Sequence, residues 1–361
     1  MQPISKKRIL VCPLDWGLGH ATRCIPIIRF LQQKNMGVII AADKAPLELL
    51  KKEFPDLEFI RFSGYEITYP DKDFMVLKML SQIPKIIRKI KSEHAQLEKI
   101  IFKNRIDAVI SDNRYGLWTK KIPSVFITHQ LTIQTPFGKK ALRKIIFSYL
   151  QKYDECWIPD VAEKNNLSGN LSHGIDLLPN IYFIGPLSRF EKKPSEKIIF
   201  QYDVMVIISG PEPQRTTFEQ LIFEQLKNTS LKAIVVRGIP ESTEKINLSE
   251  NVKIFSHLNS EEMQSYISAS EIIISRSGYS TIMDLARLEK KAVLIPTPGQ
   301  TEQEYLANYL SAQKIIFSVE QNKFNLQNAI LEAYKTKGFT SSENYFLFEK
   351  VLGTWLEKIF F

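Results

Sequence analysis

Cysteine is scarce in this sequence of 361 residues, which contains only Cys12, Cys24 and Cys156. Three cysteines cannot all be paired, and their spacing matches none of the paired motifs that bind zinc. The sequence therefore predicts neither a disulfide framework nor a zinc site. Because structural disulfides persist in oxidising compartments, we expect a protein of the reducing cytoplasm rather than an exported one.

Long apolar runs are also missing from the sequence. No apolar segment approaches the roughly 18 residues that indicate a transmembrane helix. The basic residues Lys6, Lys7 and Arg8 precede only a short apolar run, which is too short for a signal peptide. We expect a cytoplasmic protein whose only membrane association would be peripheral, at the inner face of the cytoplasmic membrane.

Several common catalytic motifs are absent as well. The sequence has no Walker A loop, no zinc-type cysteine and histidine spacing and no G-x-S-x-G elbow. Asp71-Lys72-Asp73 has the D-x-D shape of metal-dependent sugar transferases, but no apolar strand precedes it, so we interpret it as a turn. We therefore expect chemistry that needs neither a metal nor another cofactor.

Positive charge, by contrast, is in excess. The formal net charge of +9 favours anionic partners such as nucleotide phosphates or an anionic membrane surface. Nucleic acid is not an expected partner, because no helix-turn-helix or stacking platform accompanies the charge. Residues 139–147 are basic and apolar together, which suits a segment lying on an anionic membrane, although a solvated helix face explains the same pattern.

Apolar runs and helical patterns alternate in both halves of the chain, which predicts two doubly wound, Rossmann-like parallel-sheet domains. A chain of 361 residues is too long for one ordinary core. Two such domains would face a central cleft and suit a ligand that bridges both. The expected divisions are an N-terminal domain at 1–187, a linker at 188–198, a C-terminal domain at 199–342, and a final helix at 343–361 that packs back toward the N-terminal domain.

A Gly/Ser/Thr loop, from Ser275 to Thr281, stands between a predicted strand and a predicted helix. Such a loop directs backbone N–H groups and the positive end of a helix dipole at one point, which suits a phosphate. Asp284 is expected in the first turn of that helix, where it accepts ribose hydroxyls or only complements the dipole. The polar segment from Pro298 to Glu304 suits hydrogen bonds to sugar hydroxyls, and an ordinary surface loop is the alternative.

The loop Gly17-Leu18-Gly19-His20 follows the first predicted strand. A histidine in this loop suits a general base, because its near-neutral pKa lets it take a proton from an attacking hydroxyl. Capping of the following helix is the alternative role. An NAD-binding fingerprint would have a third glycine where this sequence has Thr22, and an acidic residue where it has Asp43. The glycine is missing but the acid is present, which keeps an NAD-dependent oxidoreductase open as an alternative.

These two motifs resemble those of the GT-B glycosyltransferases represented by the MurG-type UDP-N-acetylglucosamine transferases, whose C-terminal domain is of the family 28 type. The resemblance covers nearly the whole chain in layout and is most specific at residues 17–23 and 275–308. In that family the N-terminal domain takes the acceptor and the C-terminal domain binds the nucleotide sugar. The resemblance thus implies a hexosyltransferase that uses a UDP-sugar, UDP-N-acetylglucosamine included, in a metal-independent inverting displacement.

The resemblance also implies roles for individual residues. His20 is the implied base, with Asp112 as the second choice, and Arg23, His129 and Gln130 lie on the acceptor side. Asp284 stands where relatives carry a glutamate that holds the ribose, and Glu304 departs from a pair of amides that contact the donor sugar. The full implied donor site is Gly17, Gly19, Ser209, Gly210, Arg215, Leu258, Arg276, Ser277, Gly278, Tyr279, Ser280, Thr281, Asp284, Gln300, Thr301, Gln303 and Glu304.

The acceptor is not identified by the sequence. Residues 73–104 and 139–147 are the expected walls of its site, and a lipid-linked or glycan acceptor of the cell envelope would fit them. A hydrolase or epimerase of the same fold is an alternative function, because water and an acceptor hydroxyl use the same donor site. A non-catalytic nucleotide-sugar-binding subunit is another.

Overall fold

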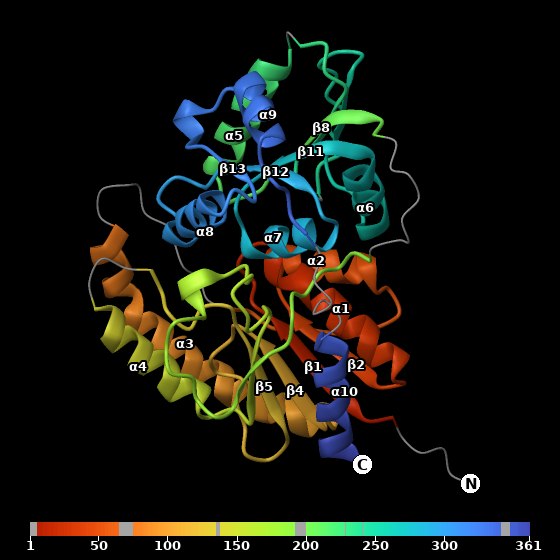
Figure 1. Ribbon diagram of the computed structural model, residues 1–361. Coiled ribbons are helices and arrows are strands. Elements are labelled where there is room, and N and C mark those ends of the chain that lie inside the picture. Colours follow the sequence, from red (N-terminus) through yellow and green to blue (C-terminus); the bar gives the residue numbers. More distant parts are fainter. Residues whose placement is uncertain are drawn as a thin grey trace. The chain divides into compact units, whose positions relative to one another are not determined.

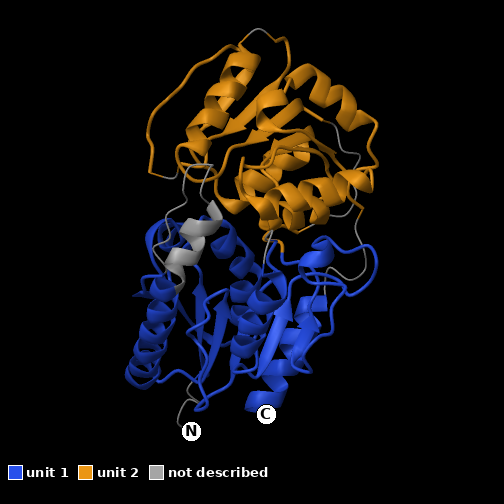
Figure 2. Ribbon diagram, turned by 90° about the vertical axis from the view of Figure 1, so that its left-hand side faces the viewer, with its two compact units in different colours: residues 1–187, 344–361 blue, residues 188–343 orange. Residues whose placement is uncertain are grey.

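The computed structural model describes residues 6–64, 75–134, 138–191, 200–227, 229–239, 241–340 and 347–361, with the main chain only over 75–83. The chain divides into two compact units (Figure 2). Unit 1 comprises Met1–Leu187 and Asn344–Phe361, and unit 2 comprises Ser188–Glu343. The Asp71-Lys72-Asp73 turn and most of the predicted linker lie outside the described residues.

Unit 1 is built on a seven-stranded sheet with the order β3-β2-β1-β4-β5-β6-β7, in which every pair is parallel. Its strands are β1 (Arg8–Pro13), β2 (Gly37–Ala42), β3 (Glu58–Arg61), β4 (Ala108–Asp112), β5 (Ser124–Ile127), β6 (Glu155–Ile158) and β7 (Ile181–Phe183). Its helices are α1 (Gly19–Gln33), α2 (Lys44–Glu53), α3 (Met75–Asn104), α4 (Lys139–Leu150), the 3₁₀ turn η2 (Gly169–Leu171) and α10 (Leu347–Phe360).

Helices cover both faces of this sheet, and α3 and α4 lie on the same face (Figure 1). Leu97 of α3 and Leu10 of β1 are both completely buried and belong to one hydrophobic cluster. On the other face the C-terminal helix α10 packs on unit 1, with the Trp355 ring 5.5 Å from the Trp157 ring. Both faces of the strands are therefore buried, which explains their nearly continuous apolar sequences.

Unit 2 is built on a six-stranded sheet with the order β10-β9-β8-β11-β12-β13, again entirely parallel. Its strands are β8 (Tyr202–Ile207), β9 (Ala233–Val236), β10 (Val252–Phe255), β11 (Ser270–Ser275), β12 (Lys291–Leu294) and β13 (Phe317–Ser318). Its helices are α5 (Gln214–Leu226), α6 (Ser260–Ala269), α7 (Tyr279–Arg287), α8 (Thr301–Ala312), the 3₁₀ turn η3 (Gln321–Lys323) and α9 (Leu326–Tyr334). The predicted pair of parallel-sheet α/β domains is confirmed.

The strand orders place the loops of interest at equivalent points. The connections reverse direction between β1 and β4 in unit 1, and between β8 and β11 in unit 2. Ligands of doubly wound sheets bind outside the carboxyl ends of the strands at such switch points. The His20 loop follows β1, and the Ser275–Thr281 loop begins at the end of β11, so both predicted motifs lie at switch points.

Two local predictions were wrong. Thr301, Gln303 and Glu304 do not lie in a loop, because α8 begins at Thr301, with Gln300 at its N-cap. Asp284 lies in the second turn of α7, whose first turn starts at Tyr279 and contains no acidic residue, so the helix dipole does not explain its position. Within the described part of the chain, no helix has the length and apolar character that spanning a membrane would need.

Candidate active site

Three neighbouring strands of unit 1 bring four polar side chains together. His20 and Arg23 lie in the first turns of α1, which follows β1. Asp112 is the last residue of β4, directly paired with Pro13 of β1, and His129 follows β5. Because parallel strands end at the same edge of the sheet, residues far apart in the sequence meet there.

Asp112 is the centre of this cluster and is completely buried. Arg23 donates to it twice, through Nε to Oδ2 at 2.6 Å and through Nη2 to Oδ1. Nδ1 of His20 lies 3.3 Å from the same Oδ1. The His20 side chain keeps 15% of its surface exposed, whereas the Asp112 side chain keeps none. Of the two candidate bases, only His20 can therefore reach a substrate in this arrangement.

The electrostatics separate the two groups further. Burial and the neighbouring cation of Arg23 lower the pKa of His20, so its imidazole is neutral at neutral pH and able to accept a proton. Although burial opposes ionisation of Asp112, Arg23 and His20 outweigh it and lower the pKa of that carboxyl to about 2. A carboxylate with so low a pKa is a poor base, and its position suits it to orient His20.

The implied acceptor-side residues differ in their exposure. Arg23 retains only 2% of its surface, and its guanidinium binds Asp112, His20 and His129. The expectation that Arg23 contacts the acceptor therefore needs correction, because its donors are directed to buried partners. His129 is also buried, whereas Gln130 is partly exposed and its backbone N–H donates to the hydroxyl of Thr128.

In unit 2 the start of α7 is a helix N-terminus whose N-cap is a glycine. This residue, Gly278, has no side chain to accept a hydrogen bond from the helix. A Cβ atom at Gly278 would meet no atom within 4 Å, so the space beside its backbone is open. Ser280 and Thr281 are partly exposed on the first turn. This geometry suits an anion such as a diphosphate.

Hydrogen bonds join this loop to the start of α8. The hydroxyl of Ser277 donates to the carbonyl of Gln303 at 2.8 Å. Oε1 of Gln303 accepts from the backbone N–H of Thr297 at 2.9 Å, and Oε1 of Glu304 accepts from that of Gly299 at 2.9 Å. The side chains expected to contact the donor sugar thus also shape their own loop, which restricts how they can point.

Asp284 has partners inside unit 2. Its Oδ1 accepts from the hydroxyl of Ser188 at 2.7 Å, and its Oδ2 lies 3.4 Å from Nε of Arg189. Burial raises the pKa of this carboxyl, opposed by the Arg189 cation. Neither Ser188 nor Arg189 was singled out in the sequence, because both were assigned to a linker. A carboxylate oxygen accepts more than one hydrogen bond, so these partners leave capacity for a ribose.

Two arginines predicted to bind the donor have structural roles in this geometry. Arg276 is buried and donates to the carbonyls of Ile295, Pro296 and Gln214, so it ties strand ends and loops together. Arg215 donates to Glu212 at 2.5 Å and to Glu219 at 2.9 Å. Its charge is therefore balanced by two carboxylates, which corrects the expectation that it belongs to the donor site.

Of the remaining predicted donor residues, Gly17 and Gly19 belong to unit 1, where Gly17 precedes α1 and Gly19 is its first residue. The others follow strands of unit 2 or begin its helices. Ser209 and Gly210 are exposed after β8, and Leu258 and Tyr279 are buried. Thr297, not singled out in the sequence, lies next to Gly210, where an added Cβ would be 3.6 Å from the threonine hydroxyl. That hydroxyl is buried and has no hydrogen-bond partner among the described residues, which suits a ligand or a water at this point.

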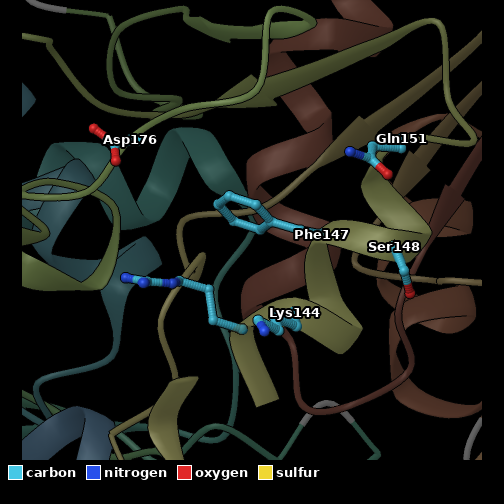
Figure 3. Close-up of a pocket in the computed structure, with 6 residues that line it drawn as sticks. Lys144, Phe147, Ser148, Gln151 and Asp176 are labelled. Carbon is cyan, nitrogen blue, oxygen red and sulfur yellow. The ribbon is translucent and has the colours of Figure 1, made fainter. Parts of the chain in front are cut away.

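The basic segment at 139–147 forms part of α4 and borders a pocket of about 370 Å³ (Figure 3). The pocket is lined by two cations, an aromatic ring and three other polar groups, namely Arg143, Lys144, Phe147, Ser148, Gln151 and Asp176. Its mixed charge gives no preference between a membrane surface and a soluble ligand. Across the described ranges no three His, Cys, Asp or Glu side chains form a group that could hold a metal ion.

Comparison with known proteins places the geometry in context. Residues 215–350 match the model of the glycosyltransferase family 28 C-terminal domain. An uncharacterized glycosyltransferase of Methanosarcina acetivorans is 25% identical over 329 residues, covering 84% of this chain and 81% of that protein. The UDP-N-acetylglucosamine–N-acetylmuramyl-(pentapeptide) pyrophosphoryl-undecaprenol N-acetylglucosamine transferase of Histophilus somni is 22% identical over 345 residues, covering 90% and 87%. The structure of spinosyn rhamnosyltransferase SpnG complexed with thymidine diphosphate matches with a TM-score of 0.60 and 13% identity, over 98% of this chain and 96% of that one.

Proposed function

Because the chain is a MurG-like glycosyltransferase with the GT-B fold, we propose that it transfers a hexosyl group from a nucleoside-diphosphate sugar to an acceptor hydroxyl. The observation that carries the mechanism is the pairing of the partly exposed His20 with the buried Asp112 at the switch point of unit 1. A neutral imidazole held against a carboxylate is suited to remove a proton from a hydroxyl.

The donor is assigned to unit 2. The open backbone at Gly278 and the first turn of α7 bind the diphosphate, and the start of α8 contacts the sugar. A UDP-sugar is the proposed donor, because the transferase of Histophilus somni is named for UDP-N-acetylglucosamine. The SpnG complex contains thymidine diphosphate instead, so a ligand screen should include nucleotides with different nucleobases.

The proposed chemical step is a direct displacement with inversion. The acceptor oxygen forms a bond to the anomeric carbon while the bond from that carbon to the diphosphate oxygen breaks. The acceptor proton passes to Nε2 of His20, and the resulting imidazolium is stabilised by Asp112, 3.3 Å from Nδ1. The bonding electrons leave with the nucleoside diphosphate, whose charge is stabilised by the α7 N-terminus.

The acceptor is proposed by analogy with a relative. A lipid-linked or glycan acceptor of the cell envelope is the proposed class, by analogy with the Histophilus somni transferase, whose name gives a pyrophosphoryl-undecaprenol derivative as its acceptor. Peripheral contact of the basic α4 with anionic membrane, from the cytoplasmic side, belongs to the same proposal.

A ligand screen with the purified full chain tests this function. Nucleoside diphosphates and their sugars should raise the melting temperature, because a ligand that binds only the folded state stabilises it. Incubation of the best donor with and without candidate acceptors then separates transfer from hydrolysis. Stoichiometric release of free sugar at the same rate in both samples would replace the transferase proposal by a hydrolase.

Metal independence is the first prediction. In the proposed mechanism the α7 N-terminus stabilises the leaving diphosphate without a metal ion. Turnover should therefore be unchanged after dialysis against EDTA. The assay compares initial rates before dialysis, after it, and after addition of Mg²⁺ or Mn²⁺. A loss of activity that either ion restores would show that a metal takes part.

Gly278 provides a second prediction. Its φ of −69° and ψ of 138° are accessible to any L residue, and a Cβ there meets no atom. Gly278→Leu should therefore fold normally while its side chain covers the α7 N-terminus. We expect nucleoside-diphosphate affinity to fall about tenfold or more, or ~1.4 kcal/mol. Calorimetry measures the change, and Gly278→Ala is the matched control with a smaller loss. If Gly278→Leu bound nucleoside diphosphate with wild-type affinity, the diphosphate would not bind at the α7 N-terminus.

Asp284 provides a third prediction. Asp284→Asn should weaken binding of a nucleoside diphosphate about tenfold, since hydrogen bonds to charged groups contribute roughly 1.5–3 kcal/mol. Binding of inorganic pyrophosphate, which lacks a ribose, should not change. Ser188→Ala is the control, because it removes the 2.7 Å hydrogen bond but keeps the carboxylate. If Ser188→Ala weakens nucleotide binding equally, Asp284 acts only by anchoring that segment.

A further inference from the structure

Arg23 contacts more of the active-site cluster than a simple ion pair requires. Its Nε and Nη2 donate to the two oxygens of Asp112. In addition, Nη2 lies 2.9 Å from Nδ1 of His20, and Nη1 lies 3.1 Å from Nδ1 of His129. One guanidinium thus contacts the carboxylate and both imidazoles, all within unit 1.

The direction of these hydrogen bonds follows from chemistry. A guanidinium has five N–H donors and no acceptor. In both contacts with histidine, Arg23 must be the donor and Nδ1 must be the acceptor. A neutral imidazole carries one proton, so a ring that accepts at Nδ1 carries its proton on Nε2. The geometry therefore assigns the Nε2–H tautomer to His20 and His129.

This assignment conflicts with the state that catalysis needs. To take a proton at Nε2, His20 must carry its own proton on Nδ1 and donate it to Asp112. Oδ1 of Asp112 is 3.3 Å from Nδ1, whereas Nη2 of Arg23 is 2.9 Å from it. Arg23 and Asp112 thus compete for the same ring nitrogen, one as a donor and the other as an acceptor, and the arginine is closer.

We propose that Arg23 is a positioning residue that holds His20 in the Nε2–H tautomer in the ligand-free protein, so that His20 becomes a base only when Nδ1–H is directed to Asp112. This inference rests on the proposed role of His20 as the base. The two tautomers differ only in which nitrogen carries the proton, so the change releases and consumes no net proton. His20 is thereby kept from activating water while no acceptor is bound.

The charges around His20 support the same role. Arg23 and His129 lower the pKa of the ring, and Asp112 raises it. Cys24, on the next turn of α1, directs its thiol toward Asp112 at 3.7 Å, and burial raises the pKa of that thiol, so it adds no charge. Removal of Arg23 should therefore change both the tautomer and the protonation range of His20.

The test is the ¹⁵N spectrum of the full chain labelled at histidine, recorded at a pH where His20 is neutral and assigned with His20→Gln. In the wild type, Nδ1 of His20 should have the shift of an unprotonated nitrogen. In Arg23→Met, which keeps the length of the side chain but has no donors, Nδ1 should become the protonated nitrogen. Arg29→Met is the matched control, because Arg29 lies on the same helix but pairs with Glu53.

Stability does not limit the test. If Arg23→Met does not fold because Asp112 loses its partner, Arg23→Met combined with Asp112→Asn removes both charges and leaves an amide oxygen to accept from Nδ1–H. The same tautomer change is expected there. A protonated Nδ1 in the wild type would overturn the proposal by itself, whatever the variants do.

A kinetic measurement separates this proposal from the proposed function. The double variant loses Asp112 as well, so it serves the tautomer measurement alone. In Arg23→Met, the acid limb of the kcat/KM profile should move to higher pH, because the repulsion from the guanidinium is lost while Asp112 still raises the pKa of His20. Arg29→Met should leave it in place. A protein that shows the expected tautomers but no transfer would disprove the function and keep the inference. Normal transfer by a wild-type protein whose His20 is protonated at Nδ1 would disprove the inference and keep the proposed function.

Discussion

His20→Ala is expected to lower kcat about 100- to 10,000-fold, the usual contribution of a general base. Donor affinity should stay unchanged, because the donor is assigned to unit 2 and His20 lies in unit 1. The loss should therefore appear in kcat rather than in nucleotide binding, and single-turnover rates and calorimetry measure the two quantities separately.

The pH dependence of the wild type belongs to the same prediction. Burial and Arg23 lower the pKa of His20. A base with a lowered pKa remains unprotonated to lower pH, so the acid limb of the kcat/KM profile should lie below the ordinary histidine value of 6.5. In His20→Ala that limb should disappear.

A second histidine of unit 1 supplies the control for His20. His94 lies outside the cluster and stacks on Trp118 with a ring distance of 4.0 Å. His94→Ala should keep nearly full turnover. If His20→Ala retained more than about one-tenth of wild-type kcat, another group would be the base, because even weak general bases contribute about 100-fold.

Asp112→Ala is expected to have the largest effect on stability. It leaves the buried Arg23 without its carboxylate, and breaking a buried ion pair in this way costs about 3–5 kcal/mol. For a unit of this size the melting temperature should fall on the order of 10 °C. Asp112→Asn, which keeps the volume, should fold better and still lose most turnover, because an amide supports an imidazolium less well than a carboxylate.

The Asp112 contribution should also depend on pH in a defined direction. The folded-state pKa of Asp112 is about 2, below the ordinary value of 3.8. The unfolded state thus binds the proton first, so the stabilisation is complete above the ordinary value and is lost as the pH falls toward 2. Chemical denaturation at several pH values should show this loss in the wild type and not in Asp112→Asn.

Asp43→Asn is the matched control for Asp112. Asp43 directly follows β2 of the same sheet, but the side chain of its partner Arg61 is 79% exposed. An ion pair with an exposed partner contributes only about 0–1 kcal/mol. Equal destabilisation by Asp43→Asn and Asp112→Asn would contradict the assignment of a buried, stabilising pair at Asp112.

Much of the fold could be predicted because its signals are local. The run Ile272 to Ile274, which precedes the Ser275–Thr281 loop, is a buried strand in the structure, in agreement with the prediction. Period and composition indicate such elements without knowledge of their neighbours. The prediction of a helix boundary was wrong where polar residues begin the helix, as at Thr301. A polar first turn and a loop have similar composition.

The sequence by itself determined the two α/β units, the His20 loop and the Ser275–Thr281 loop, since each motif is contiguous along the chain. Only the tertiary structure decided which charged residues face a ligand and which face each other. Arg23 donates a hydrogen bond to Asp112, 89 residues away in the sequence, and Asp284 accepts one from Ser188, 96 residues away. Pairing of this kind depends on which strand ends and segments lie side by side, and no local pattern carries that information.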